Sequence, residues 1–165
     1  MKSHARIGDH PLHPLLIVIP AGTFVAALAF DVVYLLSDNP IWWQGTKPLM
    51  LVGVIGALIA AVPGLIDLIG VVPKQGATRI GVTHMVLMLI AVALFAWNDY
   101  LRWDAAAPPP PTRTYLGFWL SLVAVVLLGI AGWLGGKMVF EYHVAVLEHP
   151  EAKDPWPGPV QQAAD

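Results

Sequence analysis

Apolar positions fill four long runs in this chain, and polar residues and prolines separate the runs. The runs cover residues 14–36, 48–69, 80–101 and 115–136. A helix needs roughly 20 apolar residues to cross the hydrocarbon layer of a membrane, and each run is that long. The pattern predicts an all-α integral membrane protein, a four-helix transmembrane bundle with its N- and C-termini on the same side.

The spans leave room for short connections only. Residues 1–147 are expected to form a single transmembrane domain, and residues 148–165, rich in Pro, Gln and Ala, a disordered tail. The prolines from Pro108 to Pro111 favour a stiff polyproline II spacer before the fourth span.

Composition agrees with lipid as the solvent. The chain of 165 residues is 57% hydrophobic and 12% charged, which is about half the charged fraction of a typical soluble domain. Its net charge of -2, without any basic run, gives no sign of a nucleic-acid partner. The chain has no cysteine, so a metal or haem would depend on His, Met, carboxylate or backbone groups.

Lysine and arginine flanking the spans indicate the orientation. The side of the termini carries Lys2, Arg6, Lys74, Arg79, Lys137 and Lys153. The other side carries Lys47, Arg102 and Arg113. The positive-inside rule therefore favours an inner (plasma) membrane protein with both termini in the cytoplasm. Aromatic residues suited to an interface gather near the outer face: Tyr34, Trp42, Trp43, Trp97, Tyr100, Trp103, Tyr115 and Trp119.

Small residues and two prolines shape the expected packing. Faces of small residues let helices approach closely in lipid, and they comprise Gly22 and Ala26, Gly56, Ala60 and Gly64, and Gly129, Gly132 and Gly136. Pro20 and Pro63 interrupt the first two spans in their cytoplasmic halves. Each proline frees a backbone carbonyl that must be satisfied by protein, water or a ligand.

The histidines gather at the cytoplasmic end. His10 and His13 precede the first span, His84 lies inside the third, and His143 follows the fourth. Asp67 is expected at the depth of His84. Neutral imidazole is a common metal ligand and a haem axial ligand. His84, His13, His143 and His10 are thus candidates for binding a cofactor, either haem b or a divalent metal ion. The candidate metal ligands are His13, His84, His143 and Asp67.

Each of these residues also has a purely structural interpretation. His10, His13 and His143 suit an interfacial surface, and a hydrogen bond from His84 to Asp67 would satisfy both groups. Asp31, the polar intramembrane residue near the outer end, could reach outward to water or cap a neighbouring helix. No nucleotide-binding loop, His-Glu-x-x-His motif or nucleophile–base arrangement is present, so the sequence does not favour an enzyme.

Several motifs resemble a known family. The segment from His10 to Leu16, followed by a span with Pro20 and Asp31, resembles the opening of the predicted membrane proteins called domain of unknown function 2231 (DUF2231). The segments Pro63–Asp67 and Gly132–Gly136, together with His84 and His143, resemble its later signatures. The resemblance covers roughly residues 8 to 147. It implies a four-helix membrane domain, chiefly bacterial, without an established activity. Some members are joined to Rieske-type or cytochrome-type domains, which hints at electron transfer.

The sequence leaves three functions open. The first is a small redox or metal-binding membrane module that meets a redox partner protein in trans. The second is a transporter or proton relay that uses Asp31, Asp67 and His84 as a polar path. The third is a non-catalytic membrane scaffold, and a homo-oligomer is compatible with all three.

Overall fold

A computed structural model describes residues 2–103 and 110–146, and its helices confirm the all-α transmembrane bundle. Four helical segments are long and apolar enough to cross a membrane, and the first of them, Leu12–Ser37, joins two consecutive helices. The elements in chain order are β1 Arg6–Ile7, β2 His10–Pro11, α1 Leu12–Leu16, α2 Val18–Ser37, α3 Pro40–Gly70, the 3-10 helix η1 Pro73–Gln75, α4 Thr78–Trp103 and α5 Pro111–Phe140. The expected tail and most of the proline-rich connection lie outside the described residues.

The helices extend beyond the apolar runs that predict them. α3 begins at Pro40 rather than near residue 48, because Asn39 caps it by accepting a hydrogen bond from the Ile41 N–H at 3.1 Å. Pro40 occupies the first turn, where its missing N–H costs nothing. α3 then continues through Pro48 and Pro63 without a break. Hydropathy marks the lipid-immersed length of a helix, whereas capping residues mark its ends.

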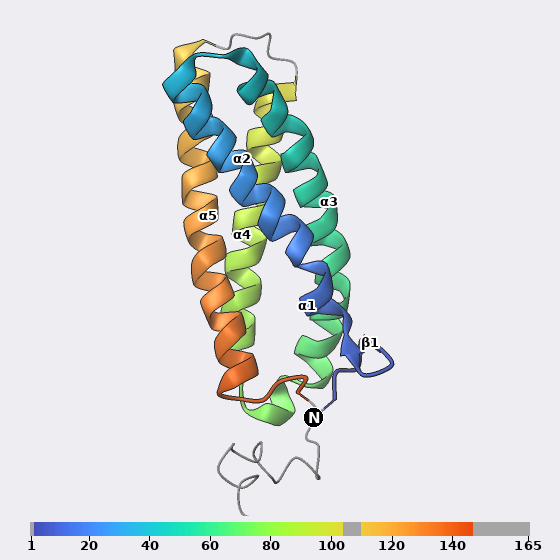
Figure 1. Cartoon of the computed structure of the whole chain (residues 1–165). Helices are drawn as coiled ribbons and strands as arrows, with labels where there is room; N and C mark the ends of the chain where they lie inside the picture. Colours follow the sequence, from blue (N-terminus) through green and yellow to red (C-terminus); the bar gives the residue numbers. More distant parts are fainter. Residues whose placement is uncertain (1, 104–109, 147–165) are drawn as a thin grey trace, which may run out of the picture.

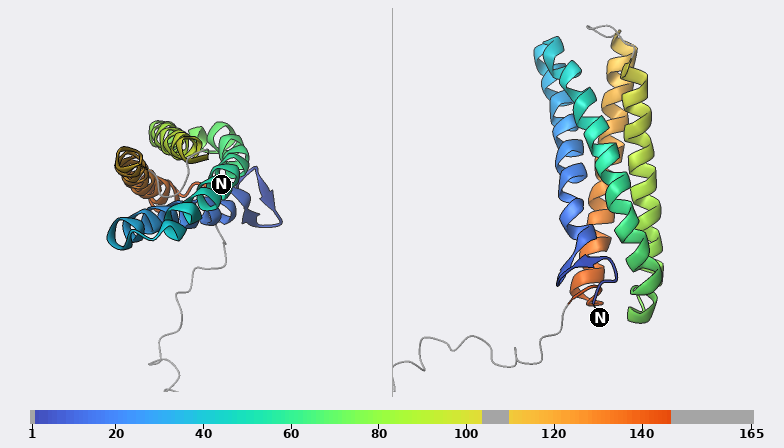
Figure 2. Two further views of the ribbon diagram at one scale, coloured as in Figure 1. Left: turned by 90° about the horizontal axis from the view of Figure 1, so that it is seen from above. Right: turned by 90° about the vertical axis from the view of Figure 1, so that its right-hand side faces the viewer.

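The four spans run up and down, each beside its neighbour in sequence, and α5 returns to lie beside α2 (Figure 1; Figure 2). The described chain starts and finishes at one end of the bundle. There Ser3 bonds to Asp67 of α3, and Val144 packs against Val71 and Val72. This end, which also carries η1, is called the histidine end below. The opposite end, with the turn from α2 to α3, is called the arginine end.

The two halves of the chain are related by an internal repeat of 71 positions. His84 stands 71 residues after His13, Phe95 after Phe24, and Arg102 after Asp31. Each of these pairs is in contact across the bundle. The rings of His13 and His84 lie 6.3 Å apart, those of Phe24 and Phe95 stack at 4.0 Å, and Asp31 binds Arg102. The α1/α2–α3 hairpin and the α4–α5 hairpin therefore meet along a line of paired residues.

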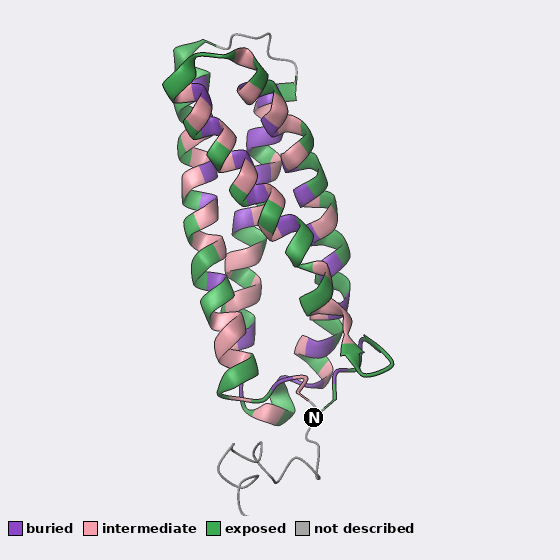
Figure 3. Cartoon of the chain, viewed as in Figure 1, coloured by how far each residue is buried: buried purple, intermediate pink, exposed green. Residues whose placement is uncertain are grey.

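Burial is concentrated toward the arginine end (Figure 3). The main apolar cluster consists of Phe24, Ala27, Met50, Ala57, Ala91, Phe95 and Ala124. α4 has no buried residue between Gly81 and Ala91, and α5 has none after Ala131. The helices around His84 are thus less tightly enclosed than those around Arg102.

Only part of the predicted small-residue packing is present. A Cβ on Gly56 would lie 3.3 Å from Pro20, so α2 and α3 do approach closely there. Gly22, Gly129 and Gly132 face no side chain or backbone within 4 Å, so the prediction of close contacts at these three glycines is wrong. Spacing identifies a face of small residues but not the direction in which that face points.

Candidate functional site

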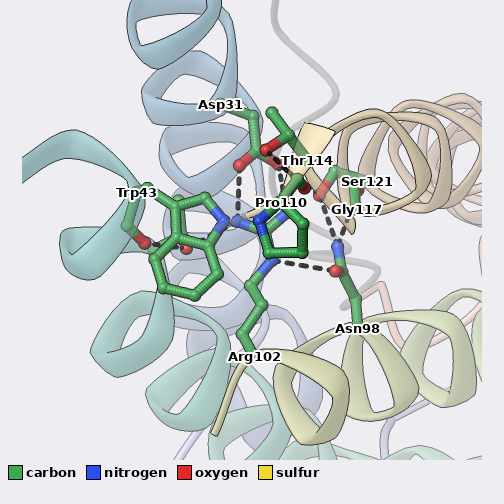
Figure 4. Close-up of polar contacts among 9 residues, drawn as sticks. Asp31, Trp43, Asn98, Arg102, Pro110, Thr114, Gly117 and Ser121 are labelled. Atoms are coloured by element: carbon green, nitrogen blue, oxygen red, sulfur yellow. Dashed lines mark hydrogen bonds and ion pairs between the residues drawn. The ribbon is translucent and has the colours of Figure 1, made fainter. Parts of the chain in front are cut away.

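A buried polar network fills the arginine end of the bundle (Figure 4). Arg102 of α4 forms a bidentate ion pair with Asp31 of α2, with distances of 2.6 Å from Nη1 to Oδ1 and 3.0 Å from Nη2 to Oδ2. Both side chains are 3% exposed. The network, called the Arg102 cluster, comprises Asp31, Trp43, Thr46, Asn98, Arg102, Gly117 and Ser121.

The other hydrogen bonds of the guanidinium and of its partner carboxylate stay within the cluster. Arg102 donates from Nε to Asn98 Oδ1 at 2.9 Å and from Nη1 to Thr46 Oγ1 at 2.8 Å. Ser121 donates to the second oxygen of Asp31 at 2.8 Å. A Cβ on Gly117 would collide with the guanidinium, so glycine supplies the space for it. All four spans contribute, and a charge pair satisfied this fully can persist away from water.

Two sequence-based expectations change here. The sequence places Arg102 among the flanking cations of the outer side, but the residue lies inside α4 and is buried against Asp31. Asp31 neither reaches water nor caps a helix, because it is 3% exposed and binds Arg102 and Ser121. Sequence reasoning missed Arg102, Asn98 and Ser121 as a group. The available signal is the 71-residue offset, which matches an acid in one repeat with a base in the other.

A pair of histidines occupies the same line at the other end of the bundle. His13 Nδ1 lies 2.8 Å from the carbonyl oxygen of Ala60, and His84 Nδ1 lies 2.7 Å from that of Ala131. Since a carbonyl only accepts, each Nδ1 carries the proton and each Nε2 keeps its lone pair when the ring is neutral. Neither Nε2 has a hydrogen-bond partner among the described residues.

A glycine lies beside each ring, but only Gly64 is needed to make room for one. A Cβ on Gly64 would lie 2.8 Å from Nδ1 of His13, and one on Gly135 would lie 3.4 Å from Cε1 of His84. Gly135 stands 71 positions after Gly64, so each hairpin has a glycine at the same place beside its histidine. The ring planes are inclined at 86°. Both imidazoles are half-buried, and each is held by a hydrogen bond to a carbonyl of its own hairpin.

The structure does not bring the other predicted residues to this pair. His10 is exposed on β2, and His143 is exposed in a left-handed turn with φ of 51°. Asp67 accepts from Ser3 Oγ at 2.6 Å and from the His4 backbone N–H at 2.8 Å. The predicted hydrogen bond from His84 to Asp67 is therefore replaced by one to Ala131. Within residues 2–103 and 110–146, no group of three His, Cys, Asp or Glu side chains is close enough to hold a metal ion.

Comparison with known families identifies the family of the chain. Residues 9–148 match the family model of the predicted membrane protein DUF2231. The chain belongs to the DUF2231 family. The match begins beside His10, and it includes His13, His84 and all seven residues of the Arg102 cluster. No curated protein and no solved structure matches the chain. The DUF2231 domain thus accounts for nearly all of the described bundle.

Proposed function

We propose that this DUF2231 protein is a redox module of the membrane that holds one haem b between His13 and His84. The observation that carries the proposal is the pair of neighbouring imidazoles, whose ring centroids lie 6.3 Å apart, each bonded to a carbonyl through Nδ1 and without a partner at Nε2 in the described chain. A backbone hydrogen bond at the far nitrogen fixes the tautomer and the ring orientation of a metal-binding histidine. Both rings therefore have the outer-shell support that an axial ligand needs.

The separation of the rings suits one metal atom between them. An imidazole nitrogen binds a metal at about 2.0–2.1 Å and lies about 1.1 Å from its ring centroid. Two rings on opposite sides of one metal thus have centroids about 6–6.5 Å apart. The centroids of His13 and His84 are 6.3 Å apart.

The number of ligands favours haem over a bare ion. A structural zinc site takes four protein ligands and a catalytic one takes three, but the described residues offer two at this point. A porphyrin supplies the equatorial ligands itself, so two axial histidines are enough. When bound, haem would supply one-electron chemistry. His13 and His84 would position the iron near one membrane surface, where a redox partner protein in trans could reach it.

The test is reconstitution of the detergent-purified protein with ferric haem. We expect a shifted Soret band, one haem per chain, and the low-spin spectrum of a six-coordinate iron. His13→Ala and His84→Ala should each lose that spectrum because one axial ligand is gone. Elemental analysis after exposure to zinc, copper and nickel salts distinguishes haem from a bare metal.

Exposed histidines provide matched controls. His10→Ala and His143→Ala remove an imidazole from the same end of the bundle without touching the pair, so they should keep the spectrum. Thermal unfolding of all four variants checks that they fold. If the native protein shows neither a Soret shift nor stoichiometric metal, the redox proposal is wrong and the scaffold alternative gains support.

The transport alternative receives no support from this geometry. Asp31 is held by Arg102, and Asp67 is held by the N-terminal segment. The stacked rings of Phe24 and Phe95 lie in the apolar cluster between these polar groups. A polar path along the bundle would have to displace that stack.

We also propose that the histidine end faces the cytoplasm. Arg102 no longer counts as a flanking charge, so the arginine end keeps only Lys47 and Arg113 of the original three. The excess of lysine and arginine at the histidine end is therefore larger than the sequence indicates. The chain has no cysteine, so single cysteines can be introduced at Lys74 and at Asp38. In intact cells an impermeant maleimide should label Asp38→Cys but not Lys74→Cys, and the reverse pattern would invert the topology.

A further inference from the structure

A groove on the outside of the bundle, between α3 and α4 at the arginine end, carries charges of both signs. One part of it has a volume of about 280 Å³ and is lined by Leu51, Val54, Ala96, Asp99, Tyr100 and Trp103. The adjoining part, also about 280 Å³, is lined by Gln44, Lys47, Pro48, Leu51 and Trp103. Leu51 and Trp103 belong to both parts, so the two form one groove.

Asp99 is the unsatisfied group of this groove. It is 7% exposed, and its Oδ1 has no hydrogen-bond partner among the described residues. Arg102 and Lys47 are near enough to act on Asp99 electrostatically, but within the described residues neither forms an ion pair with it. Arg102 is already committed to Asp31. A buried carboxylate oxygen left without a donor is costly, so this position favours a cation or donor from outside the chain.

Lys47 is the complementary group. Its ammonium donates to the Trp103 carbonyl at 3.4 Å and lies 4.9 Å from the centre of the Trp43 ring. Within the described residues it has no carboxylate partner. The groove thus contains an anion in one part and a cation in the other, neither in an ion pair within the described residues, and Leu51 and Trp103 line both parts.

The surroundings are those of the lipid head-group region. Tyr100 and Trp103 are 69% and 59% exposed, and such aromatic side chains favour the membrane interface. In the part that holds Asp99, the remaining wall consists of the aliphatic residues Leu51, Val54 and Ala96. We infer that the groove binds a phospholipid with a primary-ammonium head group, of the phosphatidylethanolamine type. Its ammonium pairs with Asp99, its phosphate pairs with Lys47, and an acyl chain follows the aliphatic wall.

A primary ammonium fits better than a quaternary one. Its N–H groups can donate to the Asp99 carboxylate, whereas a trimethylammonium has no hydrogen to donate. A head group without an amine would bring its phosphate beside Lys47 and leave Asp99 unpaired. The groove should therefore rank phosphatidylethanolamine above phosphatidylcholine, and both above phosphatidylglycerol.

Native mass spectrometry of the detergent-purified full chain with each of these three lipids tests the inference. We expect one phosphatidylethanolamine to remain bound, about tenfold or more tightly than the other two, because a charge-assisted hydrogen bond is lost with them. Asp99→Asn should remove the preference by a similar factor. Lys47→Met should weaken binding of all phospholipids.

Asp38→Asn is the matched control, since Asp38 is an exposed aspartate at the same end of the bundle. It should leave the preference unchanged. Oδ1 of Asp99 makes no hydrogen bond within the described chain, so Asp99→Asn should fold normally, which thermal unfolding verifies. Equal binding of all three lipids, no binding, or an unchanged preference in Asp99→Asn would each overturn the inference.

Discussion

Replacing Arg102 by methionine is expected to destabilise the bundle by about 3–5 kcal/mol, because it leaves the buried carboxylate of Asp31 without its partner. Asp31→Leu should cost a similar amount, since it leaves the guanidinium unpaired. Both groups are 3% exposed, so neither can recover hydration without opening the helix bundle. Equilibrium unfolding in mixed micelles with increasing denaturing detergent measures these losses.

The double variant Asp31→Leu/Arg102→Met should be far less damaged than either single one. It removes both charges together, and an apolar pair of similar volume can replace a buried ion pair at little net cost. Asn98, Thr46 and Ser121 would still lose partners, at about 0.6 kcal/mol for each hydrogen bond between membrane helices. A double variant as unstable as the sum of the two singles would mean that the pair contributes no coupling energy.

The 71-residue repeat gives the Arg102 cluster a place in the architecture. When two similar hairpins pack against each other symmetrically, a residue at their contact lies opposite the residue at the equivalent position of the other hairpin. At Phe24 and Phe95 the counterparts are identical and stack, and at His13 and His84 they are identical and lie 6.3 Å apart with their ring planes inclined at 86°. Two identical charges would repel at such a position. The chain instead has Asp31 in one hairpin and Arg102 in the other, which makes the contact attractive.

The sequence predicts the bundle well because its main signal is the length of apolar runs, and bilayer thickness requires that length. It also predicts that His13 and His84 lie at one end, because alternation of the spans fixes which residues share a depth. Their mutual contact and their carbonyl partners are not predictable in this way. Depth says nothing about rotation about the helix axis, and rotation decides whether His84 faces Ala131 or Asp67.

Arg102 escapes sequence-based prediction for a related reason. A hydropathy window ends where charge begins, so an arginine just past residue 101 is assigned to a loop. In the structure α4 continues to Trp103, and the helix turns Arg102 inward toward Asp31. A charged residue at the end of a span can belong to the core when another span offers its opposite. Aligning one half of the chain with the other pairs these two residues directly, because they occupy equivalent positions of the repeat.

In the proposed haem site, replacing Gly64 by alanine is expected to weaken haem binding about 10–100-fold, the usual loss when an outer-shell partner of a metal ligand is disturbed. The new Cβ would lie 2.8 Å from Nδ1 and 3.0 Å from Cε1 of His13, which is too close for the ring to stay. The ring would then give up its 2.8 Å hydrogen bond to Ala60. Haem titration followed by absorption measures the change in affinity.

The internal repeat supplies the control for this substitution. Gly135→Ala adds the same methyl group at the equivalent place beside His84, but its Cβ would lie 3.4 Å from Cε1 and 3.6 Å from Nδ1. Those distances need at most a slight adjustment, so the affinity should change less than about threefold, since well-accommodated changes cost little. The imidazole ¹⁵N resonances give a readout independent of haem: Nδ1 of His13 should change in Gly64→Ala, and Nδ1 of His84 should not change in Gly135→Ala. Equal effects of the two substitutions on affinity and on these resonances would show that contact with the glycine does not position His13.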